Sequence, residues 1–144
     1  MTSADKQLVD TRPPENFAGE EQEPSLFLQA FMPALSMKKE GLDLQTGHIP
    51  GAVSVPYPSM YQEDGVTFKT KEDLTALFQK QGVKLKQPII ASCYVGLTAC
   101  IFALAASECG LGDVSVYHGS WVEYGQRAPQ PKVQRSRFSS VPSS

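Results

Sequence analysis

The chain has 144 residues, of which 41% are apolar and 19% are charged, and these values fit one compact domain with its own core but not two. The formal net charge of -2 gives no bulk attraction to nucleic acid or to an anionic membrane, so we expect neither as a partner. No stretch approaches the roughly 20 consecutive apolar residues that a membrane-spanning helix needs.

The three cysteines are too few and too irregularly spaced for a disulfide framework, which favours a reducing compartment. We therefore expect a cytoplasmic protein. A mitochondrial location agrees less well with the sequence, because residues 1–10 hold two acids and no arginine, and they also lack the apolar centre of a signal peptide. The cysteines and histidines do not have the spacing of a zinc site, so we expect no metal.

The first half of the chain begins with a predicted buried strand at residues 7–10, which the following prolines end. Residues 14–47 are interpreted as a long excursion with one short helix, in which segment 26–37 is apolar. We expect that segment to pack onto the domain, and the alternative is a surface for a partner. A second strand is predicted at residues 52–55.

The second half contains the clearest amphipathic helix, predicted at residues 71–78 with Thr70 as its cap and Gly82 at its end. Residues 88–93 form a continuous apolar run that ends in a cysteine, which is typical of a central strand buried on both faces. An alanine-rich helix is predicted next, at residues 98–109.

A last strand is predicted at residues 113–117, and Ser120 and Glu123 have the spacing of a capping box at the start of a short helix. Prolines and serines predict a disordered tail at residues 129–144. Strands that alternate with helices predict an α/β fold with a parallel sheet, in which ligands bind at the carboxyl ends of the strands. Cys93 lies at such an end.

The loop after Cys93 connects the predicted central strand to the next helix and contains Gly96. A loop of this length can turn backbone N–H groups toward the sulfur, and the helix that begins near Thr98 adds its positive end. Both effects stabilise an anionic sulfur, and a thiolate is the nucleophilic form of cysteine. Gly96 is expected to adopt a positive φ. The alternative is that Cys93 is a small buried apolar residue.

Four stretches in the same order resemble the rhodanese superfamily, and most of all the carboxyl-terminal catalytic domain of the 3-mercaptopyruvate and thiosulfate sulfurtransferases. They are Leu8-Val9-Asp10-Thr11-Arg12, Gly47-His48-Ile49-Pro50-Gly51-Ala52, Cys93-Tyr94-Val95-Gly96-Leu97-Thr98-Ala99-Cys100 and Val116-Tyr117-His118-Gly119-Ser120-Trp121. The resemblance implies a rhodanese-like three-layer domain at residues 6–128, with a parallel sheet of about five strands flanked by helices.

The resemblance also implies a sulfurtransferase without a cofactor. Cys93 would take a sulfur atom from 3-mercaptopyruvate or thiosulfate as a persulfide and pass it to a small thiol, a thioredoxin-like protein or cyanide. The loop around the sulfur would be formed by Tyr94, Val95, Gly96, Leu97 and Thr98. Arg12 would hold the acidic part of the donor, since a guanidinium binds such a group with two N–H donors. The alternative for Arg12 is an internal ion pair.

The sequence departs from the usual pattern of this family at several positions. Tyr94 and Val95 replace the basic or small residues that follow the catalytic cysteine, residues 17–19 lack a second arginine, and His118 stands where aspartate is usual. Such enzymes also usually have an amino-terminal domain that completes the site. The alternative function is therefore a non-catalytic interaction module or a persulfide carrier. Overall similarity puts mercaptopyruvate slightly ahead as the donor. A phosphatase of related fold is not expected, because no arginine ends the loop.

The remaining cysteines and histidines have simpler interpretations. His48 is expected to stabilise its loop. His118 lies just past a strand end on the active side, where its charge could affect a nearby thiolate. Cys100 and Cys109 are expected to pack against the sheet.

Overall fold

The computed structural model describes residues 6–20, 46–94, 96–111 and 113–127, with only the backbone for residues 126 and 127. The elements follow one another in this order: β1 (Gln7–Asp10), α1 (Pro14–Ala18), β2 (Val53–Ser54), the 3-10 helix η1 (Tyr57–Met60), α3 (Lys71–Lys80), β3 (Ile89–Ser92), α4 (Leu97–Glu108), β4 (Val114–Val116) and α5 (Ser120–Arg127). Strands and helices therefore alternate as the sequence predicts. No helix among these residues is long and apolar enough to cross a membrane.

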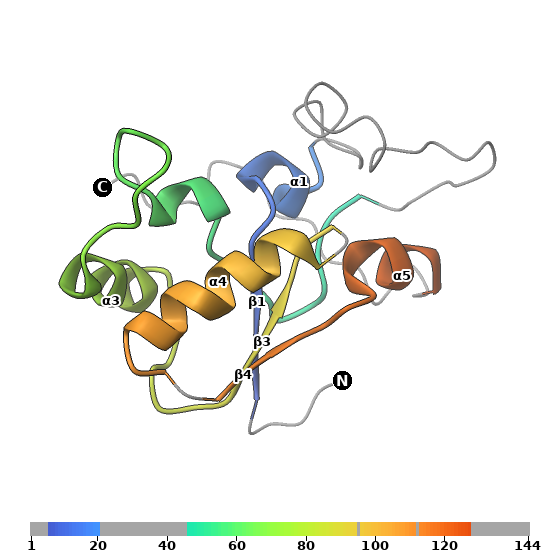
Figure 1. The fold of residues 1–144 in the computed structure, drawn as a ribbon. Helices are drawn as coiled ribbons and strands as arrows, with labels where there is room; N and C mark the ends of the chain where they lie inside the picture. Colours follow the sequence, from blue (N-terminus) through green and yellow to red (C-terminus); the bar gives the residue numbers. More distant parts are fainter. Residues whose placement is uncertain (1–5, 21–45, 95, 112, 128–144) are drawn as a thin grey trace.

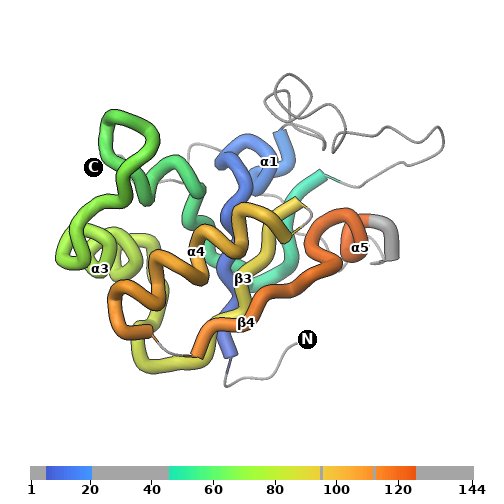
Figure 2. The backbone as a smooth tube through the Cα atoms, in the orientation of Figure 1, coloured from blue at the N-terminus to red at the C-terminus, as the bar shows by residue number. Residues whose placement is uncertain are grey.

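The strands form one parallel sheet in the order β2-β1-β3-β4. In its register Asp10 lies opposite both Ser54 and Ser92, so the carboxyl ends of the first three strands meet at one edge. The path of the chain brings the start of α4 and α5 to that same edge (Figure 2). The implied sheet of about five strands is corrected to four within the described residues, because four segments there have strand character and all four pair in this sheet.

Helices cover both faces of this sheet (Figure 1). On one face Phe78 of α3 and Phe102 of α4 pack in a buried cluster with Val9 of β1. On the other face Trp121 of α5 belongs to a second cluster, against which Leu8 of β1 packs. Successive residues of a strand point to opposite faces, so neighbours in β1 contribute to separate cores. This is the three-layer α/β arrangement.

The predicted helices of the second half are confirmed with shifts of one or two residues at their ends. α3 begins after Thr70, whose hydroxyl accepts a hydrogen bond from the N–H of Asp73 at 3.2 Å, as expected of a cap. α4 begins at Leu97, one residue earlier than predicted, with Gly96 as its N-terminal cap. The apolar pattern was sufficient here because it sets which face of each helix is buried.

The short helix expected in the excursion is α1, which begins directly at Pro14 because proline is compatible with the first helical turn. It ends at Gly19, which has a φ of 86°. The apolar segment 26–37 and the tail 129–144 lie outside the described residues.

Candidate active site

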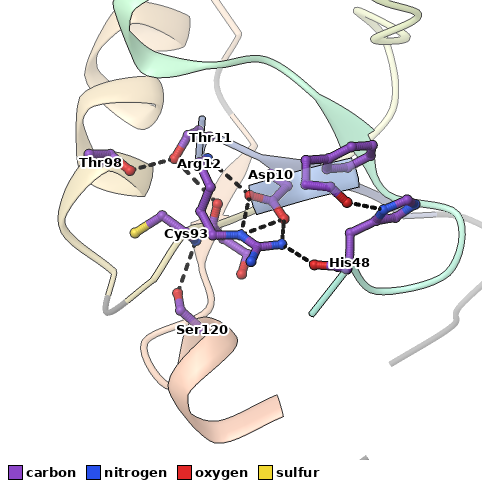
Figure 3. A network of polar contacts seen from close by, with 10 residues as sticks. Asp10, Thr11, Arg12, His48, Cys93, Thr98 and Ser120 are labelled. Atoms are coloured by element: carbon purple, nitrogen blue, oxygen red, sulfur yellow. Dashed lines mark hydrogen bonds and ion pairs between the residues drawn. The ribbon is translucent and has the colours of Figure 1, made fainter. Parts of the chain in front are cut away.

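Cys93 directly follows β3, at the carboxyl edge of the sheet and next to the start of α4 (Figure 3). Its sulfur accepts a hydrogen bond from the backbone N–H of Gly96 at 3.0 Å. Gly96 has a φ of 98°, which confirms the predicted positive φ and explains why glycine is suitable there. Cys93 itself is only 2% exposed. The loop thus places a backbone donor and a helix N-terminus at a buried sulfur, an arrangement that stabilises negative charge on it.

The start of α5 fixes the backbone of this loop from the other side. The N–H of Trp121 donates to the Cys93 carbonyl at 2.9 Å, and the N–H of Val122 donates to the Tyr94 carbonyl at 3.1 Å. The Ser120 hydroxyl accepts from the N–H of Cys93 at 3.1 Å and donates to the Tyr117 carbonyl at 2.7 Å. Three groups of α5, namely the Ser120 hydroxyl and the N–H groups of Trp121 and Val122, are therefore committed to the residues that follow β3 and β4.

The predicted role of Ser120 as a helix cap is therefore wrong. Ser120 is the first residue of α5, with a φ of 48°, and its hydroxyl bonds to the strand ends. The spacing to Glu123 indicated a helix start correctly, but it could not show that a distant N–H competes for the hydroxyl.

Replacing Ser120 with alanine is expected to lower the free energy of unfolding by about 1–3 kcal/mol, because it leaves the buried N–H of Cys93 without its acceptor. Chemical denaturation measures this loss. Ser107→Ala is the matched control, since Ser107 is exposed on α4 and should change stability by less than about 0.5 kcal/mol. Equal effects of the two substitutions would contradict the assigned role of Ser120.

Arg12 is used within the fold. Its Nε lies 3.1 Å from both carboxylate oxygens of Asp10, and one terminal nitrogen lies 2.7 Å from Oδ2 of Asp10 and 2.6 Å from the Gly47 carbonyl. The guanidinium also lies over the Trp121 ring, 4.4 Å from its centroid. Its side chain is 2% exposed, so the internal ion pair that was the alternative for Arg12 is present. Donor binding by Arg12 stays a prediction.

The other predicted loop residues have different surroundings. The Thr98 hydroxyl lies 2.7 Å from that of Thr11, which joins the end of β1 to the first turn of α4. Tyr94 is buried in the cluster with Trp121, on the far face of the sheet from α4. Leu97 is half exposed. Val95 lies outside the described residues. Among the predicted site residues, the structure therefore brings together Cys93, Gly96 and Thr98 around the start of α4.

Sequence reasoning missed two features of this region. It did not single out Asp10, and it did not find the hydrogen bonds that the Ser120 hydroxyl makes to the strand ends. A carboxylate two residues before an arginine, at the end of a strand, is a signal that could have identified Asp10. The expectation for His48 is confirmed: its Nδ1 lies 2.7 Å from the Phe17 carbonyl, and the two rings stack with centroids 3.7 Å apart. His48 therefore holds the loop before β2 against α1.

The remaining cysteines differ from one another. Cys109 is partly buried and packs against the main core, as expected. Cys100 is exposed, so its predicted packing against the sheet is wrong. The helical period explains the error, because Ala99 and Phe102 occupy the inward face of α4. Among the described residues, no group of three or more histidine, cysteine or acidic side chains could hold a metal ion.

Two tyrosines near this edge have a raised pKa. Burial raises the pKa of Tyr57, and the charge of nearby Tyr61 raises it further. Burial also raises the pKa of Tyr124, whose ring packs beside that of Trp121. Both hydroxyls therefore stay protonated and uncharged at neutral pH.

A buried cysteine with an amide donor at its sulfur, between a central parallel strand and a helix start, defines a domain suited to nucleophilic or sulfur-carrying chemistry. The chain belongs to the rhodanese family: the family model described as the rhodanese-like domain matches residues 1–127.

Curated relatives include enzymes of two sulfur-donor types. The chain is 43% identical over 123 residues to thiosulfate sulfurtransferase of Rattus norvegicus, which covers 85% of this chain and 36% of the relative. It is 37% identical over 132 residues to 3-mercaptopyruvate sulfurtransferase of Homo sapiens, covering 91% and 39%. The chain therefore spans somewhat more than a third of the length of these relatives.

Solved structures agree with this assignment. The sulfur transferase subunit of yeast mitochondrial complex I matches with a TM-score of 0.72 and 34% identity, over 92% of this chain and 38% of that chain. The 3-mercaptopyruvate sulfotransferase SseA of Escherichia coli matches with a TM-score of 0.58 and 31% identity, over 82% and 37%.

Proposed function

We propose that this domain is a sulfurtransferase that carries sulfur on Cys93. The Cys93 thiolate attacks the outer sulfur of thiosulfate or the thiol sulfur of 3-mercaptopyruvate. A new S–S bond forms on Cys93, and the bond from that sulfur to the donor breaks, releasing sulfite or the enolate of pyruvate, which takes up a proton. A small thiol or a thioredoxin-like protein then attacks the outer sulfur, and the electron pair of the S–S bond returns to Cys93.

The observation that carries this proposal is the hydrogen bond from Gly96 N–H to the Cys93 sulfur at the start of α4. The attacking thiolate, the persulfide and the regenerated thiolate are all anionic sulfur species. One fixed donor and the positive end of a helix stabilise each of them without any rearrangement of the loop. Membership of a family with sulfurtransferase relatives supports the same conclusion.

The two donors are both retained in this proposal. Overall similarity suggested a slight preference for mercaptopyruvate, but the identity to the rat thiosulfate enzyme, 43%, exceeds the 37% to the human mercaptopyruvate enzyme. The comparisons therefore give that preference no support.

The second candidate is a persulfide carrier or interaction module. Its supporting observations are the 2% exposure of Cys93 and the internal ion pair of Arg12, which leave the sulfur covered and the expected donor-binding group occupied. A carrier would accept sulfur without rapid turnover, and an interaction module would accept none.

A steady-state assay distinguishes these functions. The purified chain is supplied with each donor in turn and a thiol acceptor, and the release of sulfite or pyruvate is measured. We expect turnover that Cys93→Ser abolishes and that Cys100→Ser preserves, since Cys100 is an exposed thiol one helical turn into α4. Absence of turnover with both donors in a folded chain would reject the enzyme and favour the second candidate.

A further inference from the structure

His118 lies beside the loop that holds the Cys93 sulfur. It follows β4 at the carboxyl edge of the sheet, and its side chain is exposed. A Cβ atom placed on Gly96 would lie 3.9 Å from Nδ1 of His118 and 3.4 Å from its carbonyl oxygen. Gly96 is also the residue whose N–H bonds to the Cys93 sulfur. One glycine therefore separates an exposed imidazole from the reactive group.

The described lysines lie elsewhere. One group stands at the amino ends of β1 and β3, on the opposite edge of the sheet, and consists of Lys6, Lys84 and Lys86. The other group lies in or next to α3 and consists of Lys69, Lys71 and Lys80. The carbonyl of Lys71 contacts the sulfur of Cys109, which places α3 at the end of α4 remote from Gly96. Arg12 is at the correct edge, but it is paired with Asp10. Among the side chains that the structure describes, His118 is the exposed basic group at this loop.

We infer that His118 is a donor-binding residue, whose imidazolium attracts the negative charge of the sulfur donor to the Cys93 loop. This inference rests on the proposed function, since thiosulfate and 3-mercaptopyruvate are both anions. The Glu123 carboxylate of α5 lies over Gly119, the residue after His118, so close that a Cβ on that glycine would collide with it. Its negative charge acts against anion binding there, and the imidazolium has to outweigh it. Asp10 and Arg12, at the end of β1, form an ion pair with each other.

The inference has a specific kinetic consequence. An imidazolium attracts an anion and a neutral imidazole does not, so donor binding should strengthen as the pH is lowered. His118→Asn is expected to raise the KM for thiosulfate about threefold to fivefold at about pH 6, the range for exposed charge pairs, with little change in kcat. His118→Lys keeps a charge at every pH tested, so it should retain the low KM and remove its dependence on pH.

Nuclear magnetic resonance of the full chain tests the binding step without turnover. The sequence has two histidines, and His48 is buried against Phe17, so it serves as an internal control. Thiosulfate is added to the Cys93→Ser variant at about pH 6 and again at about pH 8.5, above the usual histidine range. We expect a saturable shift of the His118 ring resonances at the lower pH, a clearly weaker one at the higher pH, and none for His48.

The outcomes separate the inference from the proposed function. If His118 does not respond to thiosulfate, or responds equally at both pH values, the inference is rejected whether or not Cys93 forms a persulfide in the parent chain. If His118 responds as expected but the parent forms no persulfide, the anion site stands and the sulfurtransferase proposal fails.

Discussion

Replacing Arg12 with alanine is expected to lower the free energy of unfolding by about 3–5 kcal/mol, the range for removing one partner of a buried ion pair. The substitution leaves the Asp10 carboxylate buried without its guanidinium, since Asp10 is 4% exposed. It also removes the donor to the Gly47 carbonyl and the cation over Trp121. One side chain thus joins β1, the loop before β2 and α5.

Chemical denaturation monitored by circular dichroism measures this loss. Arg12→Lys is the matched variant, because it keeps the charge but not the planar set of donors, and it should fall between alanine and the parent. If Arg12→Ala unfolds like the parent but raises the KM for both anionic donors, Arg12 binds the donor as the family resemblance implied, and the ion pair is not a structural requirement.

Replacing Trp121 with alanine is expected to cost about 3–5 kcal/mol, as for other large buried aromatic side chains. Trp121 is 1% exposed and is the centre of the core between α5 and the sheet. The Arg12 guanidinium lies over its ring. Gly125 packs closely against the same ring, since a Cβ on Gly125 would lie only 3.0 Å from the indole nitrogen.

Trp121→Phe should recover part of this stability, since it retains an aromatic ring over the same strands. Urea denaturation followed by circular dichroism compares the three chains. A change of less than about 1 kcal/mol for alanine would contradict the described packing of α5, because even single core truncations commonly exceed that value. Trp121 is also the single tryptophan of the chain, so its fluorescence reports on α5 in the Ser120 and Arg12 variants.

Local pattern was enough to predict the elements that position the site. The apolar run that ends in Cys93 predicted β3, and the glycine and alanine-rich segment after it predicted the loop and α4. These features depend on neighbouring residues, because a strand, a turn and a helix start have to follow one another within a few positions. The positive φ of Gly96 follows from the same local geometry.

Contacts between distant segments were not predictable in the same way. The alternatives for Arg12 stayed open because its partners include Gly47 and Trp121, far along the chain. Ser120 was assigned to its own helix although its hydroxyl bonds to the N–H of Cys93, 27 residues away in sequence. The number of strands was taken from the family resemblance, and pairing within the described part of the chain gives four. The cytoplasmic location and the disordered tail stay predictions.

Intact-mass spectrometry of the chain after incubation with thiosulfate, and separately with 3-mercaptopyruvate, tests the central claim most directly. The parent is predicted to gain one sulfur atom, to lose it again on addition of a thiol, and to do neither once Cys93 is replaced by serine. A folded parent that gains no sulfur from either donor, or a Cys93→Ser variant that gains it equally, would contradict the role of Cys93 as the sulfur carrier.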